Sequence, residues 1–361
     1  MSTHTDSPRC FIVPPYLLTH LAQLEDPRLA HAASAAQRAL AAASQIRAVR
    51  RGEPAPPRQS MRGTDAVRRQ ASAPGRPERY ISDAEGTEEL PGRLVRSEGE
   101  PPTPDESVNE AYDGLGETYS LFWEAFSRNS IDGEGIPLAA TVHFCEAYDN
   151  AFWDGTQMVF GDGDGQVFVG FTSSLSVIGH ELTHGVTQYT ANLVYSGQSG
   201  ALNESVSDVF GALVEQHSRG QSADEASWLI GEGIFSAEVE GQALRSMKAP
   251  GTAYDDDVLG KDPQPADMSG YIETEDDYGG VHLNSGIPNR AFYLAATAIG
   301  GNAWDAPGQI WYETLTTEVK ANADFREFAE ATVVAASRLF GDDSREASAV
   351  RTAWQTVGVT A

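Results

Sequence analysis

The sequence predicts an α+β protein with two lobes, a β-rich N-terminal lobe followed by a helical C-terminal lobe. Its 361 residues exceed what one hydrophobic core comfortably holds. Apolar and polar residues alternate at 140–144, and apolar runs at 158–160 and 167–169 flank a Gly/Asp-rich turn and favour a hairpin. After about residue 194 the apolar period is helical, with helices expected at 201–217, 223–235, 284–300, 306–320, 324–340 and 344–356.

The first fifty residues differ from the rest and form a leader. They contain an extended, proline-bearing start and then an Ala-rich, helix-like run from about Pro27 to Arg50. Residues 51–79 combine prolines with arginines, as is typical of an exposed linker, where proteolytic cutting concentrates. We therefore expect three units, 1–56, 57–193 and 194–361, and a processing site between about residues 47 and 80.

Charge is divided unevenly along the chain. Residues 1–80 hold 12 arginines and 6 acidic residues, whereas the remaining 281 hold 13 basic and 46 acidic residues. A body this acidic repels phosphates, so the composition excludes a nucleic-acid partner.

Two further observations concern where the protein is located in or outside the cell. No apolar run is long enough to cross a membrane, and the first twenty residues lack the apolar core of an ordinary secretory signal. The two cysteines are too few for a disulfide framework. We therefore expect no membrane partner, and a protein that is cytoplasmic or secreted by a non-classical route.

The most informative stretch is His180-Glu181-Leu182-Thr183-His184. In a helix, residues four apart project from one face, so both imidazoles can bind one metal ion while Glu181 stays beside it. This is the spacing found in zinc peptidases. Two incidental histidines on a helix face are the alternative.

A third ligand follows in the next expected helix. Glu204 and Asp208 are again four residues apart, on a helix whose apolar residues predict burial. Buried carboxylates need a metal ion or a partner. We assign Glu204 as the third zinc ligand and Asp208 as the acceptor for the N–H of a ligand imidazole. If both face solvent instead, they are ordinary surface acids.

These motifs resemble, in order, those of the thermolysin family of neutral zinc metallopeptidases. The similarity covers about residues 107–361 and includes the stretches 149–155, 161–165, 179–187, 200–208 and 279–289. The short leader, with Pro14, Pro15 and Tyr16, resembles the protealysin-like branch. The resemblance implies the family's two-domain fold, with the zinc-binding helix at the cleft between the lobes.

The resemblance also implies a catalytic centre. Zn²⁺ is the expected cofactor, and Glu181 is placed to take a proton from the attacking water. His282 and Tyr195 align with the family's donors to the tetrahedral intermediate, and Asp277 aligns with the acid that holds the histidine ring. The alternatives are an ordinary turn histidine, an ordinary loop aromatic and a solvated acid.

Substrate contacts follow by the same resemblance. Asn150, Ala151 and Arg245 align with residues that hydrogen-bond the substrate backbone. Arg245 lies in a strongly acidic lobe, so pairing with a buried acid is a second role for it. The family cleaves on the N-terminal side of bulky hydrophobic residues. Candidates for the apolar pocket are Val177, Ile230 and Leu244, for which core packing is the alternative.

Calcium binding is expected to be reduced relative to thermolysin. Glu215 and Glu232 align with calcium ligands of the family, but carboxylates are replaced by Ser176, Ser227 and Leu229. The Asp-rich turn at 161–165 fits either a calcium loop or a plain turn.

The leader is expected to inhibit the enzyme in cis. Pro14, Pro15 and Tyr16 resemble the segment that lies across the family's cleft, and proline lacks the N–H that a substrate strand donates. Cys10 is a candidate zinc ligand through its thiolate, and a free thiol is the alternative.

We therefore predict a monomeric zinc endopeptidase that acts on protein or peptide substrates and is made as a self-processing, propeptide-inhibited precursor. One alternative is a non-catalytic, zinc-stabilised peptide-binding protein, and another is an exopeptidase on the same motif. Against the first, the sequence keeps Glu181, Tyr195 and His282, which a pure binding site does not need.

Overall fold

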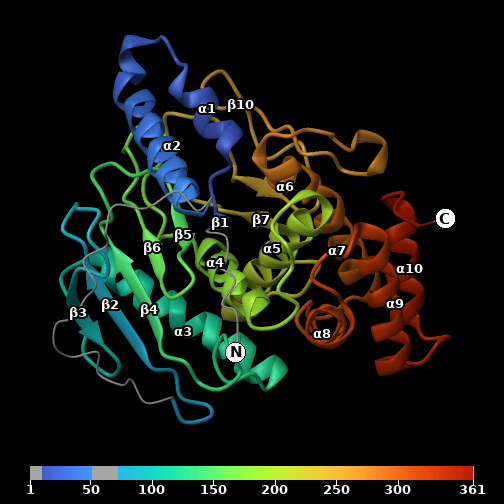
Figure 1. Ribbon diagram of the computed structural model, residues 1–361. Coiled ribbons are helices and arrows are strands. Elements are labelled where there is room, and N and C mark those ends of the chain that lie inside the picture. The colour runs from blue at the N-terminus through green and yellow to red at the C-terminus, as the bar shows by residue number, and fades with distance from the viewer. Residues whose placement is uncertain (1–9, 51–71, 361) are drawn as a thin grey trace.

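The structure, a computed structural model, describes residues 10–50 and 72–360 (Figure 1). The side chains of residue 10 and of residues 43–50 fall outside the description. One lobe is built on a β-sheet and the other on helices, with α4 (Leu175–Gln188) and α5 (Gly197–Arg219) where the lobes meet. The predicted α+β architecture is confirmed.

The main sheet contains six strands in the order β1-β5-β6-β4-β2-β3. These are β1 (Cys10–Phe11), β2 (Arg79–Asp83), β3 (Arg93–Ser97), β4 (Leu138–Val142), β5 (Ala151–Trp153) and β6 (Met158–Phe160). The β2–β4 and β4–β6 pairs are parallel, and the others are antiparallel. Strand β1 belongs to the leader and lies at the edge of the sheet beside β5, so leader and body share one sheet.

The predicted hairpin between residues 158–160 and 167–169 is not formed. Strand β6 pairs with β5 and β4, and Phe168 makes only an isolated bridge with Phe235. Val167 and Phe168 are fully buried, so packing into the core decides their conformation. The carboxylate of Asp164 closes the turn before them by accepting from the Val167 amide at 2.7 Å.

The helical lobe continues from α5 to the C-terminus. It contains α6 (Asp277–Asn284), α7 (Gly286–Ile299), α8 (Ala306–Glu313), a π-helical turn at Thr314–Glu318, α9 (Phe325–Phe340) and α10 (Arg345–Thr356). Short elements precede α6: β9 (Asp255–Asp256), β10 (Gly260–Lys261) and the 3-10 turn Met268–Gly270. In Figure 1, α9 and α10 form the end of the molecule farthest from the sheet.

The helix predicted at 223–235 is absent. Strands β7 (Leu229–Ile230) and β8 (Arg245–Ser246) pair there instead. Trp228, Gly231 and Gly233 have φ angles of 58°, 76° and 86°, which a right-handed helix does not contain. The apolar residues at 223–235 therefore belong to a turn and to strand β7 of a short antiparallel strand pair, and not to a helix.

Helices α4 and α5 pack in close contact because glycines lie at their crossing. A Cβ added to Gly211 of α5 would meet the Ser176 carbonyl oxygen at 2.5 Å and the His180 nitrogen at 3.0 Å. Helix α3 (Glu106–Phe126) packs against both of them. The resulting contact brings residues 180–184 of α4 next to residues 203–208 of α5.

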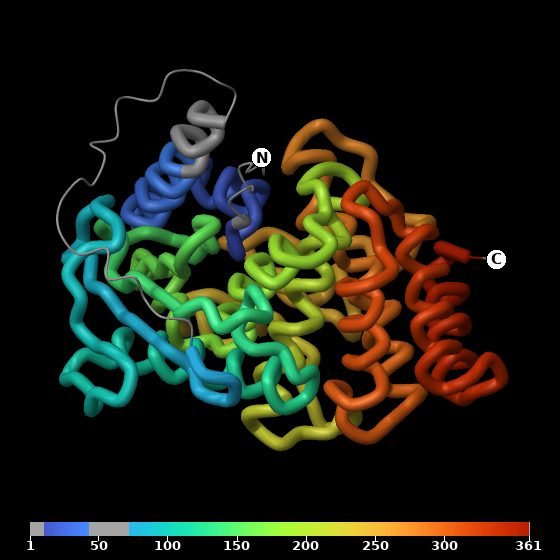
Figure 2. The backbone as a smooth tube through the Cα atoms, turned by 60° about the horizontal axis from the view of Figure 1, so that its bottom comes forward, coloured from blue at the N-terminus to red at the C-terminus, as the bar shows by residue number. Residues whose placement is uncertain are grey.

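The leader forms α1 (Pro15–Ala22), the 3-10 turn Pro27–Leu29 and α2 (Ala30–Arg50). Three buried leucines of α1, Leu17, Leu18 and Leu21, join the main core. Figure 2 shows the leader helices on the outside of the molecule, beside the sheet. The predicted boundary at 193/194 lies between α4 and α5, whereas the boundary at residue 56 lies outside the described residues. The three-unit division stays a prediction.

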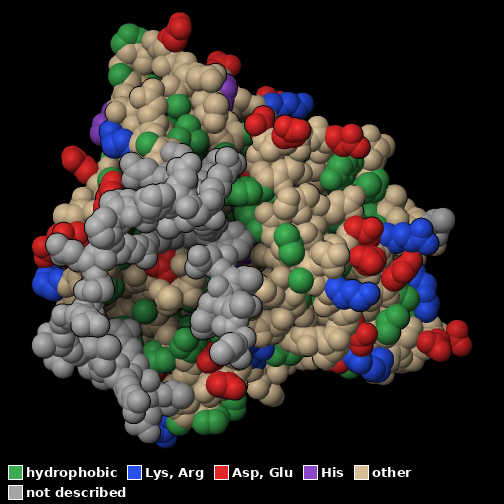
Figure 3. All heavy atoms as spheres, in the orientation of Figure 1, with side chains coloured by type: hydrophobic (Ala, Val, Ile, Leu, Met, Phe, Trp, Pro, Cys, Tyr) green, Lys and Arg blue, Asp and Glu red, His purple; other side chains and the backbone are tan. Residues whose placement is uncertain are grey.

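The sequence predicts an acidic body and no segment that crosses a membrane. Figure 3 shows acidic side chains dispersed over the face that it draws rather than gathered in one patch. No helix in the described ranges has the length and apolarity needed to cross a bilayer.

His143 connects the start of α3 to the Asp-rich turn. Its Nε2 lies 2.9 Å from Asp105 Oδ2, and its Nδ1 lies 2.9 Å from the Asp162 carboxylate. Asp105 also caps α3, because its Oδ1 accepts from the Val108 amide at 3.3 Å. The hydrogen bond to Asp162, together with Asp105, raises the pKa of His143 to about 9 despite partial burial.

We predict that His143→Gln removes part of the pH dependence of stability. A pKa raised from 6.5 to about 9 stabilises the fold fully below pH 6.5, and this contribution is lost as pH rises through about 9. The contribution is about 1–2 kcal/mol, since a quarter of the side chain is exposed and solvent screens the pair. The free energy of unfolding in urea is measured at pH 6 and pH 9.5 for the inactive Glu181→Gln precursor, with and without His143→Gln. The contribution of His143 is the difference between these two proteins in how much their stability changes with pH.

Taking that difference cancels other titrations, including that of buried Asp149, whose pKa is raised to about 9 by burial and by Asp164. His31→Gln, at an exposed position of α2, is the matched control and leaves the pH dependence unchanged. Equal pH dependence with and without His143 would contradict the ion-pair account.

Candidate active site

Three buried side chains meet between α4 and α5. His180 and His184 lie one turn apart on α4, and Glu204 lies on α5, with their ligand atoms within 4.8 Å of one another. The two Nε2 atoms are 3.0 Å apart, and each lies 3.5 Å from a Glu204 carboxylate oxygen. These are the three predicted zinc ligands, and the structure brings them together.

The other ring nitrogen of each histidine faces an oxygen. His180 Nδ1 lies 2.7 Å from Asp208 Oδ1, and His184 Nδ1 lies 2.8 Å from Asn203 Oδ1 and 3.1 Å from Ser207 Oγ. With protons on Nδ1, both Nε2 atoms carry lone pairs directed at the same space, where a metal cation would relieve their repulsion.

The electrostatics fit a metal site as well. Burial lowers the pKa of His184 to about 3, which keeps the imidazole neutral, the form that binds metal. Burial alone would raise the pKa of Glu204, but the surrounding histidines hold it below its usual value. Glu204 Oε2 has no hydrogen-bond partner among the described residues. Two neutral imidazoles and one carboxylate are a donor set that suits Zn²⁺.

Sequence reasoning missed Asn203 and Ser207. Both lie on α5, four residues apart, each directly before a predicted site residue. The same i, i+4 spacing that led to Glu204 and Asp208 was present one position earlier. It carried no separate signal, because amide and hydroxyl side chains are common on any helix.

Asp208 is a hub of charge-assisted hydrogen bonds. Arg245 donates to both of its oxygens, from Nε at 2.9 Å and from Nη2 at 2.8 Å, and Asn289 Nδ2 donates at 2.8 Å. Burial would raise the pKa of Asp208, but Arg245 and His180 hold it well below its ordinary value. Arg245 therefore pairs with a buried acid, and its Nη1 also donates to the Ile12 carbonyl at 3.0 Å. The structure contains the pairing with a buried acid, whereas binding of a substrate carbonyl by Arg245 stays a prediction.

Glu181 lies on α4 beside the histidines and is fully buried. Its Oε2 accepts from the Trp153 amide at 2.9 Å, whereas its Oε1 has no hydrogen-bond partner among the residues that the structure covers. Burial, and then the charge of Glu204, raise its pKa well above the ordinary value. The side chain is held at one oxygen and has the other one available to accept a proton.

His282 and Tyr195 both approach the carboxylate of Glu204. His282 Nε2 lies 3.3 Å from the Tyr195 hydroxyl and 3.5 Å from Glu204 Oε2, and Tyr195 donates to the other Glu204 oxygen. His282 Nδ1 lies 2.7 Å from Asp277 Oδ1, as the predicted pairing requires. Burial would lower the pKa of His282, but Asp277 and Glu204 raise it to about 9.

The backbone before His282 explains how Asp277 reaches it. Residues 277–280 all have positive φ, from 51° to 89°, and this left-handed run folds the chain back on itself. Asp277 Oδ2 accepts from the His282 amide at 2.8 Å while Oδ1 faces the ring.

Three of the predicted substrate-binding residues, Asn150, Ala151 and Arg245, form hydrogen bonds with the leader. Asn150 Oδ1 accepts from the Val13 amide at 3.0 Å, and its Nδ2 donates to the Val13 carbonyl at 3.3 Å. The Ala151 carbonyl accepts from the Ile12 amide at 3.2 Å. The candidate pocket residues are buried in the same apolar cluster as Ile12: Val177, Ile230 and Leu244.

The predicted inhibitory residues follow directly in the chain. Pro14 caps α1 and Pro15 begins it. Tyr16 is half-buried as a residue, and burial of its hydroxyl, followed by Tyr254 and Asp262, raises its pKa well above 10. The backbone of Cys10 pairs with Trp153, but its side chain lies outside the description, so the thiol–zinc hypothesis stays untested.

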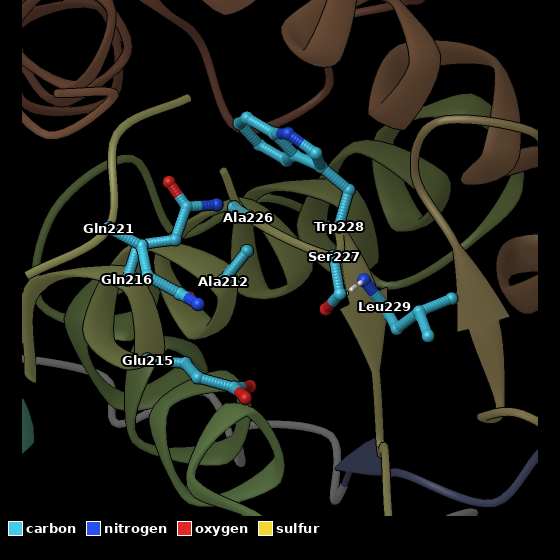
Figure 4. Close-up of a pocket in the computed structure, with 8 residues that line it drawn as sticks. All are labelled: Ala212, Glu215, Gln216, Gln221, Ala226, Ser227, Trp228 and Leu229. Atoms are coloured by element: carbon cyan, nitrogen blue, oxygen red, sulfur yellow. Dashed lines mark hydrogen bonds between the residues drawn. The ribbon is translucent and has the colours of Figure 1, made fainter. Parts of the chain in front are cut away.

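The proposed calcium positions hold few carboxylates. Glu215 lines a small hollow in which it is the single carboxylate among eight residues, with Ser227 and Leu229 nearby (Figure 4). Arg219 Nη1 lies 2.7 Å from Glu215 Oε1, and Ser227 donates to Glu232 at 3.2 Å.

Comparison with known proteins agrees with this geometry. Residues 73–188 match the thermolysin metallopeptidase catalytic domain, and residues 191–359 match the thermolysin metallopeptidase alpha-helical domain. An extracellular metalloprotease from Pectobacterium carotovorum subsp. carotovorum is 55% identical over 286 residues, covering 79% of this chain and 82% of the relative. An extracellular minor metalloprotease from Serratia marcescens is 51% identical over 204 residues, covering 56% and 58%.

A solved structure is similar over nearly the whole length, leader included. The precursor of protealysin, a metalloproteinase from Serratia proteamaculans, is 48% identical and superposes with a TM-score of 0.86, covering 97% of this chain and 100% of that one. This match supports a precursor with its own propeptide, as the leader's position in the site indicates.

One prediction is wrong. We expected a cytoplasmic protein or one secreted by a non-classical route, but two relatives are named extracellular metalloproteases, which points to secretion. Absence of a recognisable signal near Met1 was too weak a basis for that expectation.

The predicted enzyme class is confirmed, and a non-catalytic peptide-binding protein is not favoured. Family models cover both lobes, the His-His-Glu site is assembled, and the leader resembles that of a known precursor. This chain belongs to the thermolysin family of zinc-dependent metallopeptidases.

Proposed function

We propose that this chain is the latent precursor of an endopeptidase whose leader occupies the substrate site in the orientation of a substrate. One observation carries the proposal: residues 11–13 form hydrogen bonds with Asn150, Ala151, Arg245 and His282. These bonds go to backbone groups of an extended strand, which is how a protease holds a substrate without regard to most of its side chains.

The residues of the site take the following roles in this proposal. His180, His184 and Glu204 would hold the zinc ion. When bound, zinc lowers the pKa of water and polarises a carbonyl. Glu181 accepts the proton of the attacking water through its free oxygen and delivers it to the leaving amine. His282 and Tyr195 donate to the carbonyl oxygen as negative charge develops on it.

Two residues position this machinery without reaching the substrate. Asp208 fixes the ring of His180, and Asp277 fixes the ring of His282. Each acceptor selects the tautomer or charge state that leaves Nε2 facing the reaction space.

Specificity for bulky hydrophobic residues on the C-terminal side of the cleaved bond is part of the proposal. Ile12 is fully buried, and its carbonyl accepts from Arg245. Val177, Ile230 and Leu244 are buried in the same main hydrophobic core as Ile12. A charged side chain there would be desolvated without a partner, so charged residues are disfavoured at this position.

Latency then comes from occupancy of the cleft. Pro14 and Pro15 end the strand, since neither can donate a backbone hydrogen bond, and the three buried leucines of α1 anchor the segment. Substrate strands compete with a leader that is covalently attached, so they are at a large disadvantage in concentration.

Activation requires that the leader be cut away. Ser72 is already tied to the body: its amide donates to the Gly135 carbonyl at 2.8 Å, and its carbonyl accepts from Asn129 Nδ2 at 3.3 Å. This supports a cut before Ser72, within the predicted window of residues 47–80, and we propose that the enzyme makes this cut itself. Reduced calcium binding and a monomeric state complete the proposal; the first is supported by the Glu215–Arg219 pair.

We predict that Glu181→Gln lowers casein hydrolysis by about 10²–10⁴-fold, because the substitution removes the proton acceptor. Zinc content, measured by elemental analysis, stays at one ion per chain, and the leader stays attached by intact mass. Glu330→Gln, exposed on α9, is the matched control and keeps full activity. Active Glu181→Gln protein would refute the assigned role; products cut only at chain ends would favour an exopeptidase.

We also predict that Asp208→Asn costs about 3–5 kcal/mol of stability, since it leaves the buried Arg245 guanidinium without its counter-charge. Zinc affinity falls by about 10–100-fold, because His180 loses its orienting acceptor. Urea unfolding of the Glu181→Gln precursor and competition with a chromogenic chelator measure the two effects. Asp267→Asn, which removes an exposed partner of Arg290, costs less than about 1 kcal/mol. An equal loss of stability in Asp208→Asn and Asp267→Asn would contradict the proposed role of Asp208 as the counter-charge of Arg245.

A further inference from the structure

The leader crosses the site in one defined register. Strand β1 lies beside β5 (Figure 1). The two strands are antiparallel, with Cys10 opposite Trp153 and Phe11 opposite Phe152. Further along, the Ile12 amide pairs with the Ala151 carbonyl, and Val13 pairs with the Asn150 side chain. Every backbone position from 10 to 13 therefore has an assigned partner.

That register places one peptide group at the centre of the site. The Phe11 carbonyl oxygen lies 3.0 Å from His282 Nε2. The nitrogen of the same peptide group belongs to Ile12 and donates to the Ala151 carbonyl at 3.2 Å. The next carbonyl, of Ile12, accepts from Arg245 at 3.0 Å. The Phe11–Ile12 bond therefore lies between two sets of groups. His282 is proposed to donate to the carbonyl oxygen as negative charge develops on it, and Ala151 and Arg245 are proposed to hold the leaving side.

Glu181 is positioned with respect to the same bond. The Trp153 amide, one residue beyond Phe152 on β5, donates to Glu181 Oε2 and leaves Oε1 without a partner among the described residues. The strand that pairs with the leader therefore also holds the proposed proton acceptor.

The flanking side chains suit the proposed specificity. Ile12 is bulky, apolar and fully buried on the leaving side. Phe11 packs its ring against Phe152 with centroids 5.4 Å apart. Neither side chain carries a charge that the buried site would reject.

We propose that the Phe11–Ile12 bond is itself a cleavage site, hydrolysed in the precursor by the active site that it occupies. This rests on the endopeptidase function proposed above. Water oxygen bonds to the Phe11 carbonyl carbon, the bond to the Ile12 nitrogen breaks, and both protons of the water end on that nitrogen. The products are a Phe11 carboxylate and an Ile12 ammonium group.

The two products differ in how the body holds them. On the N-terminal side, the described contacts consist of the two-residue strand β1 and the Phe11 contacts. On the C-terminal side, Arg245, Asn150 and the leucines of α1 hold the chain, which also remains joined to the body through the linker. The fragment ending at Phe11 leaves, and the chain that now begins at Ile12 stays latent until the linker is cut.

A peptide with the sequence of residues 7–16 tests the register with processed enzyme, which has no leader in its cleft. Mass spectrometry should find one cut, between Phe11 and Ile12. The same peptide with Ile12→Asp should be cut at least about tenfold more slowly, because its carboxylate would have to enter an apolar site. A cut at any other bond, or no cut by enzyme that digests casein, overturns the proposal while leaving the proposed function intact.

Intact mass of the precursor over time tests the event in the full chain. A species that begins at Ile12 should form at a rate independent of protein concentration, show no casein hydrolysis, and be absent from Glu181→Gln protein. Linker processing that goes to completion with Met1 to Phe11 still attached to the leader would overturn the proposal.

Hydrogen exchange on the Glu181→Gln precursor gives a readout that needs no activity. The amides of Ile12 and Val13 should exchange at least about tenfold more slowly than in the free peptide, because both are hydrogen-bonded in the cleft. Unprotected amides at both positions would overturn the register. If both Glu181→Gln and unmodified protein lack peptidase activity while these amides are protected, the proposed function fails and the register stands.

Discussion

The buried carboxylate of Asp208 is the constraint on which the rest of the site depends. From α5 it accepts hydrogen bonds from His180 on α4, Arg245 on β8 and Asn289 on α7. Neither Asp208 nor Arg245 has access to solvent, so a lost partner cannot be replaced by water. One carboxylate therefore sets the ring orientation of a proposed metal ligand and the place of the cation that we propose binds substrate. The metal site and the substrate site are coupled through a shared counter-charge rather than by proximity alone.

That coupling is available only because α4 and α5 approach so closely. At their crossing, the backbone of Gly211 faces Ser176 and His180 with no room for a Cβ. Wider separation would draw Asp208 and Glu204 away from the two histidines together, since both acids lie on the same helix. On α4, Gly179 faces Gly211, and a Cβ added to Gly179 would lie 3.0 Å from the Gly211 Cα. Packing at these two glycines therefore sets the distances between the proposed ligands. A conformational cost at glycine in a helix is offset by burial of the facing helices.

Much of the site could be predicted because its signals are local. His180, His184, Glu204 and Asp208 follow helical spacing, and helical geometry converts that spacing into a shared face. Asn203 and Ser207 were missed, because their contact with His184 depends on how α5 is rotated against α4, which is a tertiary property. The helix expected at 223–235 failed for a related reason. Its apolar spacing fits a helix, but positive φ at Trp228, Gly231 and Gly233 interrupts the helix. The apolar side chains of this segment are therefore presented by a turn and a short strand pair. Packing likewise overrode the strand expected at 167–169.

The same hydrogen bonds explain why the leader is both inhibitor and candidate substrate. Asn150, Ala151, Arg245 and His282 bind backbone groups, and they bind them in the leader as they would in any extended chain. Inhibition therefore needs no distortion of the catalytic groups and depends on the attachment of the leader to the body. Covalent attachment corresponds to an effective concentration of about millimolar, which a cut in the linker reduces to the bulk concentration of a free peptide. In the proposed function, a cut in the linker, rather than a cut in the cleft, therefore ends latency.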